Sequence, residues 1–293
     1  MADDKPPVAG IDATRPSVAR VYDYWLGGRD NFAVDREMAG RMAAVNPAMP
    51  RLVRANRAFL RAAATRAAAA GVGQFLDLGA GLPAHPAVHD AARAVIPDAR
   101  ACYVDNDPAA VIHAGELLGQ GEGLAAIAAD LTDPDAVLAH PGVRAVLDLG
   151  RPAGIILGAV LHFMPAPQAA LLCRRYMDEA AEGSWLIVSA GHYRDKELAA
   201  RLQQAATHAR FFNHDEAAIA SWLAGLDIVP PGIGEATRWV AGADGVPASE
   251  PAFALAAAAV KPGAQPRARL PRPAHDQQVA GGREVDQPAP GPG

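Results

Sequence analysis

A short apolar run that ends in an acid and opens into a glycine turn is the feature that most constrains the fold of this chain. Residues 74–81 read QFLDLGAG, so that Asp77 stands just before the turn. A second apolar run, residues 101–105, also ends in an acid, Asp105. This layout is typical of nucleotide-type cofactor sites at the carboxyl ends of parallel strands. The chain is therefore predicted to have an α/β fold with such a site.

The acid before the turn bears on which cofactor is bound. A carboxylate at Asp77 would repel a pyrophosphate, but it suits a ligand that carries an ammonium and a sulfonium group. This favours S-adenosyl-L-methionine over NAD. Gly79 and Gly81 are weak evidence by themselves, because residues 79–84 also fit a loose G-x-G-x-x-A dinucleotide pattern. A glycine turn that binds no ligand is the remaining alternative.

Acids at the ends of three successive strands are more specific than any one of them. Asp105 could accept hydrogen bonds from ribose hydroxyls. A third apolar run, residues 124–129, is followed by Asp130, where an adenine amino group could lie. Since an unpaired carboxylate is costly to bury, an acid at each strand end indicates a polar ligand there.

Composition excludes several classes of protein. The 293 residues carry a net charge of −5 and contain no Lys/Arg-rich run, which argues against binding to nucleic acid. No uninterrupted apolar stretch reaches the roughly 20 residues that span a bilayer. Cys102 and Cys173 each lie in an apolar context, so buried free thiols are expected. We expect a soluble, cytoplasmic protein that has no membrane contact and no metal.

Alternation of strand-like and helix-like segments begins at residue 73, after a helical region from about Ser17 to Ala70. Breaks are expected near Gly27-Gly28, as a helix C-cap, and at Asn46-Pro47. Strands are predicted at 73–78, 100–105, 124–129, 153–160 and 184–190, and helices at 84–96, 107–119, 133–140, 166–182 and 195–209. This order predicts a Rossmann-like, mostly parallel seven-stranded sheet with helices on both faces.

The end of the chain completes the sheet. A helix is predicted over 213–226 with Asn213 as its cap, followed by strands at 227–229 and 252–260 that close the sheet with one antiparallel strand. The predicted organisation is a disordered N-terminus at 1–14, a helical cap at 15–70, a cofactor-binding domain at 71–261 and a disordered Pro/Gly-rich tail at 262–293.

The segment 15–32 crowds aromatic and hydrogen-bonding side chains into a few turns. It is either an amphipathic helix packed on the core or a lid that lines the cofactor site. A second cluster on the next long helix contains Arg51, Arg54, Asn56 and Arg57. Arg57 could pair with the carboxylate of the ligand; an internal salt bridge from this cluster to Asp30 or Asp35 is the alternative.

The runs at residues 19–32, 54–60, 75–83, 103–108 and 160–165 together resemble an S-adenosylmethionine-dependent methyltransferase family found mainly in actinobacteria and formerly a domain of unknown function. The resemblance covers residues 15–260 and implies a class I methyltransferase fold with an N-terminal helical cap. Leu82-Pro83 replaces a third glycine that many such folds carry, a feature that the family shares. A small residue on the fourth strand, Gly158, is expected to enlarge the site slightly.

The resemblance also implies roles for individual residues. The methionine part of the cofactor should contact Asp77, Gly79 and Gly81. The ribose should bind Asp105, and the adenine should lie near Asn106, Asp130 and Leu131.

Two residues are candidates for work on the methyl acceptor. His162 follows the fourth strand and could take a proton from a hydroxyl or amine, or else only cap the strand. Tyr22 could position the acceptor or pack in the core. Surface positions are expected for His85 and His89, and exposed positions at a helix start for His192 and Tyr193.

The predicted function is in-line transfer of a methyl group to a small-molecule acceptor, and the oligomeric state is open. A non-catalytic S-adenosylmethionine-binding or regulatory protein is a second possibility. An NAD(P)-dependent oxidoreductase is a third, but Asp77 argues against it. So does the absence of a Tyr-x-x-x-Lys pair, since the only lysines are Lys5, Lys196 and Lys261.

Overall fold

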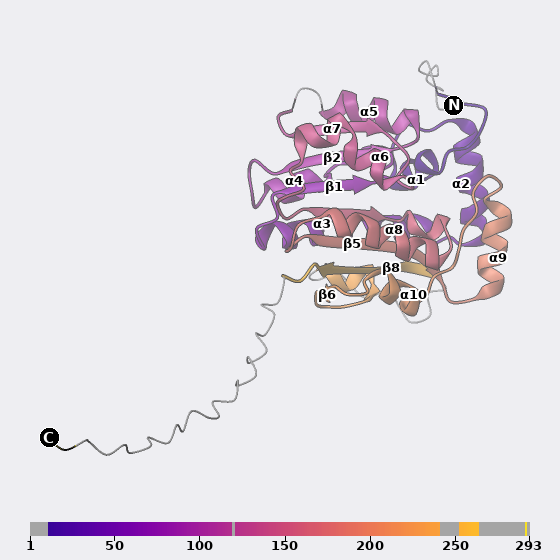
Figure 1. The fold of residues 1–293 in the computed structure, drawn as a ribbon. Coiled ribbons are helices and arrows are strands. Elements are labelled where there is room, and N and C mark those ends of the chain that lie inside the picture. The colour runs from indigo at the N-terminus through magenta and orange to yellow at the C-terminus, as the bar shows by residue number, and fades with distance from the viewer. Residues whose placement is uncertain (1–10, 119–120, 241–251, 264–290, 292–293) are drawn as a thin grey trace. The chain divides into compact units, whose positions relative to one another are not determined.

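In the computed structural model, a single mixed sheet forms the centre of the fold (Figure 1). The structure describes residues 11–118, 121–240, 252–263 and 291. Residues 1–263 make up one compact unit and residues 264–293 a second one. The predicted disorder of 1–14 and 262–293 falls mostly on residues outside the described ranges.

Parallel strands make up the first part of the sheet. Its path is β3-β2-β1-β4-β5-β8-β6, with β7 pairing off this path to β8. The strand bounds are β1 Gln74–Leu78, β2 Arg100–Asp105, β3 Leu124–Ala128, β4 Gly154–Gly158, β5 Trp185–Tyr193, β6 Asp227–Ile228, β7 Gly234–Glu235 and β8 Ala252–Val260. β1 to β5 are mutually parallel, whereas β8 runs antiparallel to β5. The predicted mostly parallel α/β sheet is thus confirmed.

Two strand predictions need correction. Within the described residues the sheet has eight strands, one more than the predicted seven, because the two-residue β7 was too short to leave a pattern in the sequence. β5 extends three residues beyond its predicted end at 190, since β8 pairs with it along its whole length, from Trp185 to Tyr193.

Three helices of the described part of the chain precede the sheet, and we call them the cap. They are α1 Val18–Leu26, α2 Ala33–Val45 and α3 Met49–Ala69. α1 ends at Gly27, whose φ of 86° and two backbone hydrogen bonds confirm the predicted C-cap.

The remaining helices lie between and after the strands. They are α4 Val88–Arg93, α5 Pro108–Leu118, α6 Pro134–Ala139, α7 Pro141–Val146, α8 Ala166–Glu179, α9 Lys196–Ala205 and α10 Glu216–Trp222, with 3₁₀ turns η1 Leu161–Phe163 and η2 Ala236–Trp239.

Four predicted helices are too long: the structure has α4, α8, α9 and α10 where 84–96, 166–182, 195–209 and 213–226 were predicted, whereas α6 lies within one residue of the predicted 133–140 at each end. α4 starts late because Pro83 and Pro86 disfavour a helical conformation in the residues before them, Leu82 and His85. The helix predicted at 133–140 is followed at once by a second one, because Pro141 holds His140 in an extended conformation. α10 is capped by Asp215, whose Oδ1 accepts a hydrogen bond from the Ala218 N–H at 2.8 Å.

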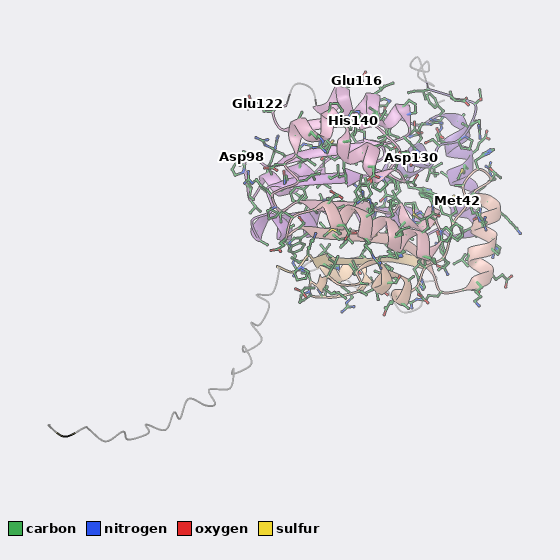
Figure 2. The ribbon with its side chains drawn as sticks, viewed as in Figure 1. Met42, Asp98, Glu116, Glu122, Asp130 and His140 are labelled. Atoms are coloured by element: carbon green, nitrogen blue, oxygen red, sulfur yellow. The ribbon has the colours of Figure 1, made fainter. Side chains whose placement is uncertain are left out.

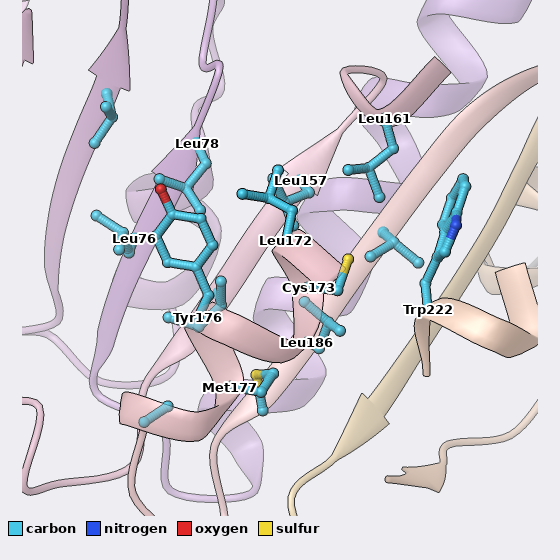
Figure 3. Packing of buried hydrophobic residues seen from close by; sticks show 14 of the residues in the cluster. Leu76, Leu78, Leu157, Leu161, Leu172, Cys173, Tyr176, Met177, Leu186 and Trp222 are labelled. Atoms are coloured by element: carbon cyan, nitrogen blue, oxygen red, sulfur yellow. The ribbon is translucent and has the colours of Figure 1, made fainter. Parts of the chain in front are cut away.

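Apolar side chains fill both faces of the sheet and the cap. One cluster packs α6, α7, α8 and α10 on the first face; there, Tyr176 lies beside Leu76 and Leu78 of β1 (Figure 3). A second cluster packs α3, α4 and η2 on the other face. A third, smaller cluster joins α1, α2, α3 and α9 to the end of β5. Among the described residues, no helix combines the length and the apolar character needed to cross a membrane.

The cap lies at the carboxyl ends of the parallel strands. Figure 2 shows Asp98 and Glu122, which precede β2 and β3, at one end of the sheet. Asp130, which follows β3, and Met42 of α2 lie toward the opposite end. Parallel α/β sheets bind their ligands outside the carboxyl ends of the strands, so the cap closes over the expected place.

Candidate functional site

The turn after β1 requires glycine at two positions. Gly79 and Gly81 have φ values of +70° and +65°, in the left-handed region that favours glycine. A Cβ on Gly79 would lie 2.4 Å from Cγ1 of Val160, so no side chain fits there. The N–H groups of Gly79 and Ala80 both donate to the Val104 carbonyl of β2, at 2.8 and 3.1 Å. The turn is therefore fixed to the neighbouring strand.

A cavity of about 460 Å³ opens in front of this turn; we call it the main cavity. Its size lies within the range of pockets for small molecules and cofactors. Most of the site residues predicted from the sequence border it: Tyr22, Arg57, Gly79, Gly81, Asp105, Asn106, Asp130 and Leu131. The fold thus brings together residues that are more than 100 positions apart in the chain. Asp77 and His162 are the two predicted site residues that do not line it.

Asp77 is buried near the end of β1, with 3% of its surface exposed. Burial raises the pKa of its carboxyl to about 6, the nearby charge of Arg57 opposes this rise, and the charge of Asp105 adds to it. A carboxylate in such a place is stabilised by a cation, and Arg57 is the cation that the protein supplies. Asp77 thus lies behind the wall of the main cavity, near Arg57 and Asp105, which line it.

Asp105 connects the glycine turn to β2. Its Oδ2 accepts from the Gly81 N–H at 2.8 Å, and its Oδ1 accepts from the Asp107 N–H at 2.8 Å. Burial raises the pKa of this carboxyl, and the two N–H donors oppose the rise. Each carboxylate oxygen keeps lone pairs for further donors. Asp105 can therefore hold the turn and accept hydrogen bonds from a ligand at the same time.

The cap supplies one wall of the main cavity. Its contributions from α1 and the residue before it are Ser17, Val18, Ala19 and Tyr22, and those from α3 are Asn56, Arg57 and Leu60. The Ser17 hydroxyl also donates to the Asp107 carboxylate, which ties the start of α1 to the loop after β2. The wall closes the cavity against solvent on the side of the cap.

A buried ion pair holds the cap together behind that wall. Nε of Arg20 lies 2.8 Å from Oδ2 of Asp35, and the two side chains are 4% and 0% exposed. Asp35 also accepts from the backbone N–H groups of Ser17 and Phe32, each at 2.8 Å. The alternative prediction paired Asp35 with the arginine cluster on α3. It is wrong, because Asp35 forms its ion pair with Arg20 of α1.

Tyr22 belongs to a polar chain that links the cap with the sheet. Its hydroxyl donates to the Val53 carbonyl at 3.1 Å and accepts from Nδ2 of Asn56 at 2.9 Å. The Asn56 Oδ1 in turn accepts from the Ser189 hydroxyl of β5 at 2.5 Å. Burial raises the pKa of Tyr22, so its hydroxyl stays protonated.

His162 lies in η1 and borders a second, smaller cavity of about 60 Å³, which we call the side chamber. Its ring packs 4.4 Å from the Phe163 ring and 5.5 Å from the Phe211 ring, measured between centroids. Burial, together with the nearby His214, lowers the pKa of His162 to about 3. The imidazole is therefore neutral throughout the ordinary pH range.

Several residues that line the main cavity received no individual role in the sequence analysis, although some lie in segments that it singled out. They are Ser17, Thr132, Val160, Phe163, Met164 and Gln168. Thr132 could have been found from its place two residues after Asp130, because a strand-end acid is commonly followed by a turn that faces the ligand. The others reach the cavity only through the packing of α1, η1 and α8.

Two predictions of exposure are wrong, and one of burial is right. His89, at the start of α4, is only 7% exposed. It packs against β2, where its Nδ1 lies 2.6 Å from the Tyr103 hydroxyl. Tyr193 is 8% exposed, because β5 continues through it and packs against the cap. Cys102 and Cys173 are buried free thiols, as expected. Within the described part of the chain, no three His, Cys, Asp or Glu side chains gather as metal ligands do.

Comparison with known proteins shows which family the chain belongs to. A family model described as S-adenosyl methyltransferase matches residues 4–262. A crystal structure of a protein from Thermobifida fusca, assigned provisionally to the methyltransferases, shares 32% sequence identity with a TM-score of 0.80 and covers 88% of this chain and 99% of its own. A DUF574 family protein from Streptomyces avermitilis shares 32% identity with a TM-score of 0.81, covering 86% and 99%. No curated protein matches the chain.

These matches confirm the predicted resemblance and the predicted class of fold. Each of the two solved relatives superposes on this chain over 99% of its own length. The cap and the sheet therefore belong to one shared architecture.

Proposed function

Because the chain belongs to the S-adenosyl methyltransferase family, with S-adenosyl-L-methionine as its cofactor, we propose that it transfers the methyl group to a small-molecule acceptor by in-line displacement. The observation that carries the proposal is the convergence of eight sequence-predicted residues on the main cavity of about 460 Å³, at the carboxyl ends of β1, β2 and β3. The cap over that cavity gives the acceptor a second wall, formed by α1 and α3.

Arg57 fits the methionine end of the cofactor. Its Nη2 donates to the Ala84 carbonyl at 3.3 Å, but its buried Nε has no hydrogen-bond partner. A buried donor that lacks a partner is costly, and a guanidinium binds a carboxylate through two parallel hydrogen bonds. The α-carboxylate of the cofactor meets both needs. Asp77 close behind supplies the negative charge that favours the α-ammonium and the sulfonium.

The nucleoside end fits the acids that follow β2 and β3. Asp105 keeps lone pairs for the two ribose hydroxyls beyond the N–H groups it already accepts. Asn106, Asp130 and Leu131 border the same cavity further along and are placed for the adenine. Leu131 is held by the Tyr176 hydroxyl, which donates to its carbonyl at 2.8 Å.

When bound, the cofactor supplies an electrophilic methyl group, whose bond to sulfur breaks with the electron pair left on sulfur as the bond to the acceptor atom forms. The residues of this chain hold the two reactants in line and exclude water. The wall formed by α1 and α3 does the second task, and the Tyr22–Asn56 pair borders the place where the acceptor would meet the methyl group.

His162 as a general base stays a prediction, and its chemistry makes this the weaker alternative. A base with a pKa of about 3 takes a proton from a hydroxyl or an ammonium only at a large free-energy cost. We therefore infer that proximity and orientation carry most of the rate, and that the acceptor atom presents a free lone pair at neutral pH.

Calorimetric titration with S-adenosylhomocysteine tests the cofactor site, with NAD and NADP as controls. We expect saturable binding of S-adenosylhomocysteine alone, weakened in Asp77→Ala. Binding of a dinucleotide instead would overturn the proposal. Turnover of labelled S-adenosylmethionine with any acceptor then separates a methyltransferase from a protein that only binds the cofactor.

A further inference from the structure

The side chamber is a second cavity, and it is distinct in chemistry from the main one. It lies between the cap and the ends of β4 and β5, and methionines 38, 42 and 49 of the cap line one part of it. Phe163, Phe211 and the His162 ring line another part and pack on one another. Most of its wall is thus apolar, aromatic or thioether.

The two cavities are adjacent, and we call their shared border the neck. Five residues border both of them: Val18, Tyr22, Asn56, Ala159 and Phe163. Among the described residues that line both cavities, Tyr22 carries the only side-chain hydroxyl and Asn56 the only side-chain amide. The polar pair of Tyr22 and Asn56 therefore lies at the border between the two cavities.

No described residue that lines the side chamber carries a formal charge. The lining contains no Asp, Glu, Lys or Arg, and its one titratable imidazole, His162, is neutral at ordinary pH. Burial of a charged ligand group against such a wall is costly, because nothing there pairs with it. The main cavity differs sharply, with Arg57 and several acids on its walls.

One polar group of the side chamber has no hydrogen-bond partner. Trp25 lines the chamber, is 8% exposed, and its buried Nε1 donates to nothing in the protein. Indole nitrogens are donors only, so a partner must be an acceptor atom. A ligand atom that reached this donor would have to be an oxygen or an unprotonated nitrogen.

We propose that the side chamber binds the methyl acceptor, and that this acceptor is an uncharged molecule whose buried part is a single ring or a group of similar size with one hydrogen-bond acceptor. This inference rests on the proposed function and names the acceptor class for the same site. An engineered cavity that binds benzene measures about 150 Å³, so the chamber, at about 60 Å³, takes such a group only when its wall moves outward. Methionine side chains have many conformations, so the three on its wall adjust to the shape of the ring. The atom to be methylated then lies at the neck, beside Tyr22 and Asn56.

Three matched one-ring probes test the charge requirement: benzyl alcohol, benzoate and benzylamine, titrated by ligand-observed NMR into protein saturated with S-adenosylhomocysteine at pH 7.5. We expect benzyl alcohol to bind at least tenfold more tightly than the benzoate anion or the benzylammonium cation. Equal affinities, tighter binding of a charged probe, or no binding of benzyl alcohol would overturn the inference.

Gly191 offers a way to fill the side chamber without strain. It lines the chamber, and an added Cβ would lie 3.4 Å from the Tyr193 hydroxyl, an ordinary contact. Gly191→Val should abolish benzyl alcohol binding, whereas Gly40→Ala, on the exposed side of α2 with nothing within 4 Å of an added Cβ, should leave it unchanged. Normal affinity for benzyl alcohol in Gly191→Val would contradict the proposal.

Two further measurements keep the test independent of folding and of the cofactor assignment. Trp25→Phe keeps an aromatic side chain but removes the N–H and the second ring of the indole, so toluene, which accepts no hydrogen bond, controls for the change in shape; benzyl alcohol should weaken about tenfold relative to toluene. S-adenosylhomocysteine is titrated into every variant first. If it fails to bind the unmodified protein, the cofactor assignment fails; if it binds while benzyl alcohol does not, only the chamber assignment fails.

Discussion

Asn56 of α3 and Ser189 of β5 form a hydrogen bond of 2.5 Å, although 133 positions separate them in the chain. Both residues are buried, and the Asn56 amide also donates to the Tyr22 hydroxyl at 2.9 Å. The bond therefore ties two helices of the cap to the centre of the sheet, at the neck between the two cavities. Any change that breaks it should affect both stability and the neck.

Ser189→Ala should lower the free energy of unfolding by about 1–3 kcal/mol, because it leaves the Asn56 carbonyl oxygen without its donor in a buried place. Urea unfolding followed by circular dichroism measures this. Ser221→Ala is the matched control, since Ser221 is exposed and bonds only within its own helix. Equal losses of unfolding free energy in the two variants would show that the Ser189–Asn56 hydrogen bond stabilises the fold no more than an exposed one does.

Asp35→Asn should destabilise the cap by about 3 kcal/mol, because it leaves the buried guanidinium of Arg20 with only the more distant carboxylate of Asp107, at 3.9 Å. Since Asp35 also accepts from the Ser17 N–H, we expect faster proteolysis of the cap and weaker binding of S-adenosylhomocysteine. Limited proteolysis with mass spectrometry and calorimetry measure both. Asp135→Asn breaks an exposed ion pair with Arg175 and should cost less than about 1 kcal/mol; a comparable loss there would contradict the expectation.

Asp77→Asn should stabilise the ligand-free protein at pH 7.5 by about 1–3 kcal/mol while it weakens cofactor binding. The folded-state pKa of Asp77 is raised to about 6 from 3.8 by burial, so the folded protein holds a proton that the unfolded chain has lost. Its contribution to stability therefore falls as pH rises from about 4 to about 6 and stays reduced above.

Urea midpoints across pH 4–8 test the prediction for Asp77. The unmodified protein should lose stability over that window relative to Asp77→Asn, and the exposed control Asp98→Asn should track the unmodified protein. Parallel curves for Asp77→Asn and the unmodified protein would mean that folding does not raise the pKa of the Asp77 carboxyl.

Arg57→Gln should weaken S-adenosylhomocysteine by about tenfold to a hundredfold, the loss expected for a charged hydrogen-bonded pair. It should leave 5′-methylthioadenosine, which lacks the amino-acid carboxylate, unchanged. Calorimetry with both ligands separates a contact to the methionine end from general damage to the site. Arg61→Gln, one turn further along α3 and outside the main cavity, is the control. Equal loss of both ligands would place Arg57 elsewhere.

Gly79→Ala should abolish S-adenosylhomocysteine binding, because the added Cβ would lie 2.4 Å from Val160 at a φ of +70°. Gly71→Ala separates backbone strain from this clash: it has a φ of +94° and nothing within 4 Å of an added Cβ. It should cost only about 1 kcal/mol, measured by thermal unfolding, and keep full binding. Binding that survives in Gly79→Ala would mean that the turn can move away from β4.

The sequence by itself determined the order of the elements and the carboxyl ends of the parallel strands as the place of the site. Strand-end acids and the glycine turn are local patterns, so the positions of Asp77, Gly79 and Asp105 at strand ends follow from the order of residues alone. Helix ends were predicted less well where a neighbouring proline decided them, as at Pro86, after which α4 starts only at Val88. The two-residue β7 was missed because pairing with β8, not any pattern of its own, defines it.

Only the tertiary structure decided how the cap meets the sheet. The pairing of Arg20 with Asp35, the burial of His89 and Tyr193, and the separation of His162 from the main cavity all follow from contacts between distant segments. The side chamber arises in the same way, since its walls come from three cap helices, η1 and β5. Local patterns carry the preferences of single elements; the shape and charge of a cavity depend on packing between elements, which no local pattern contains.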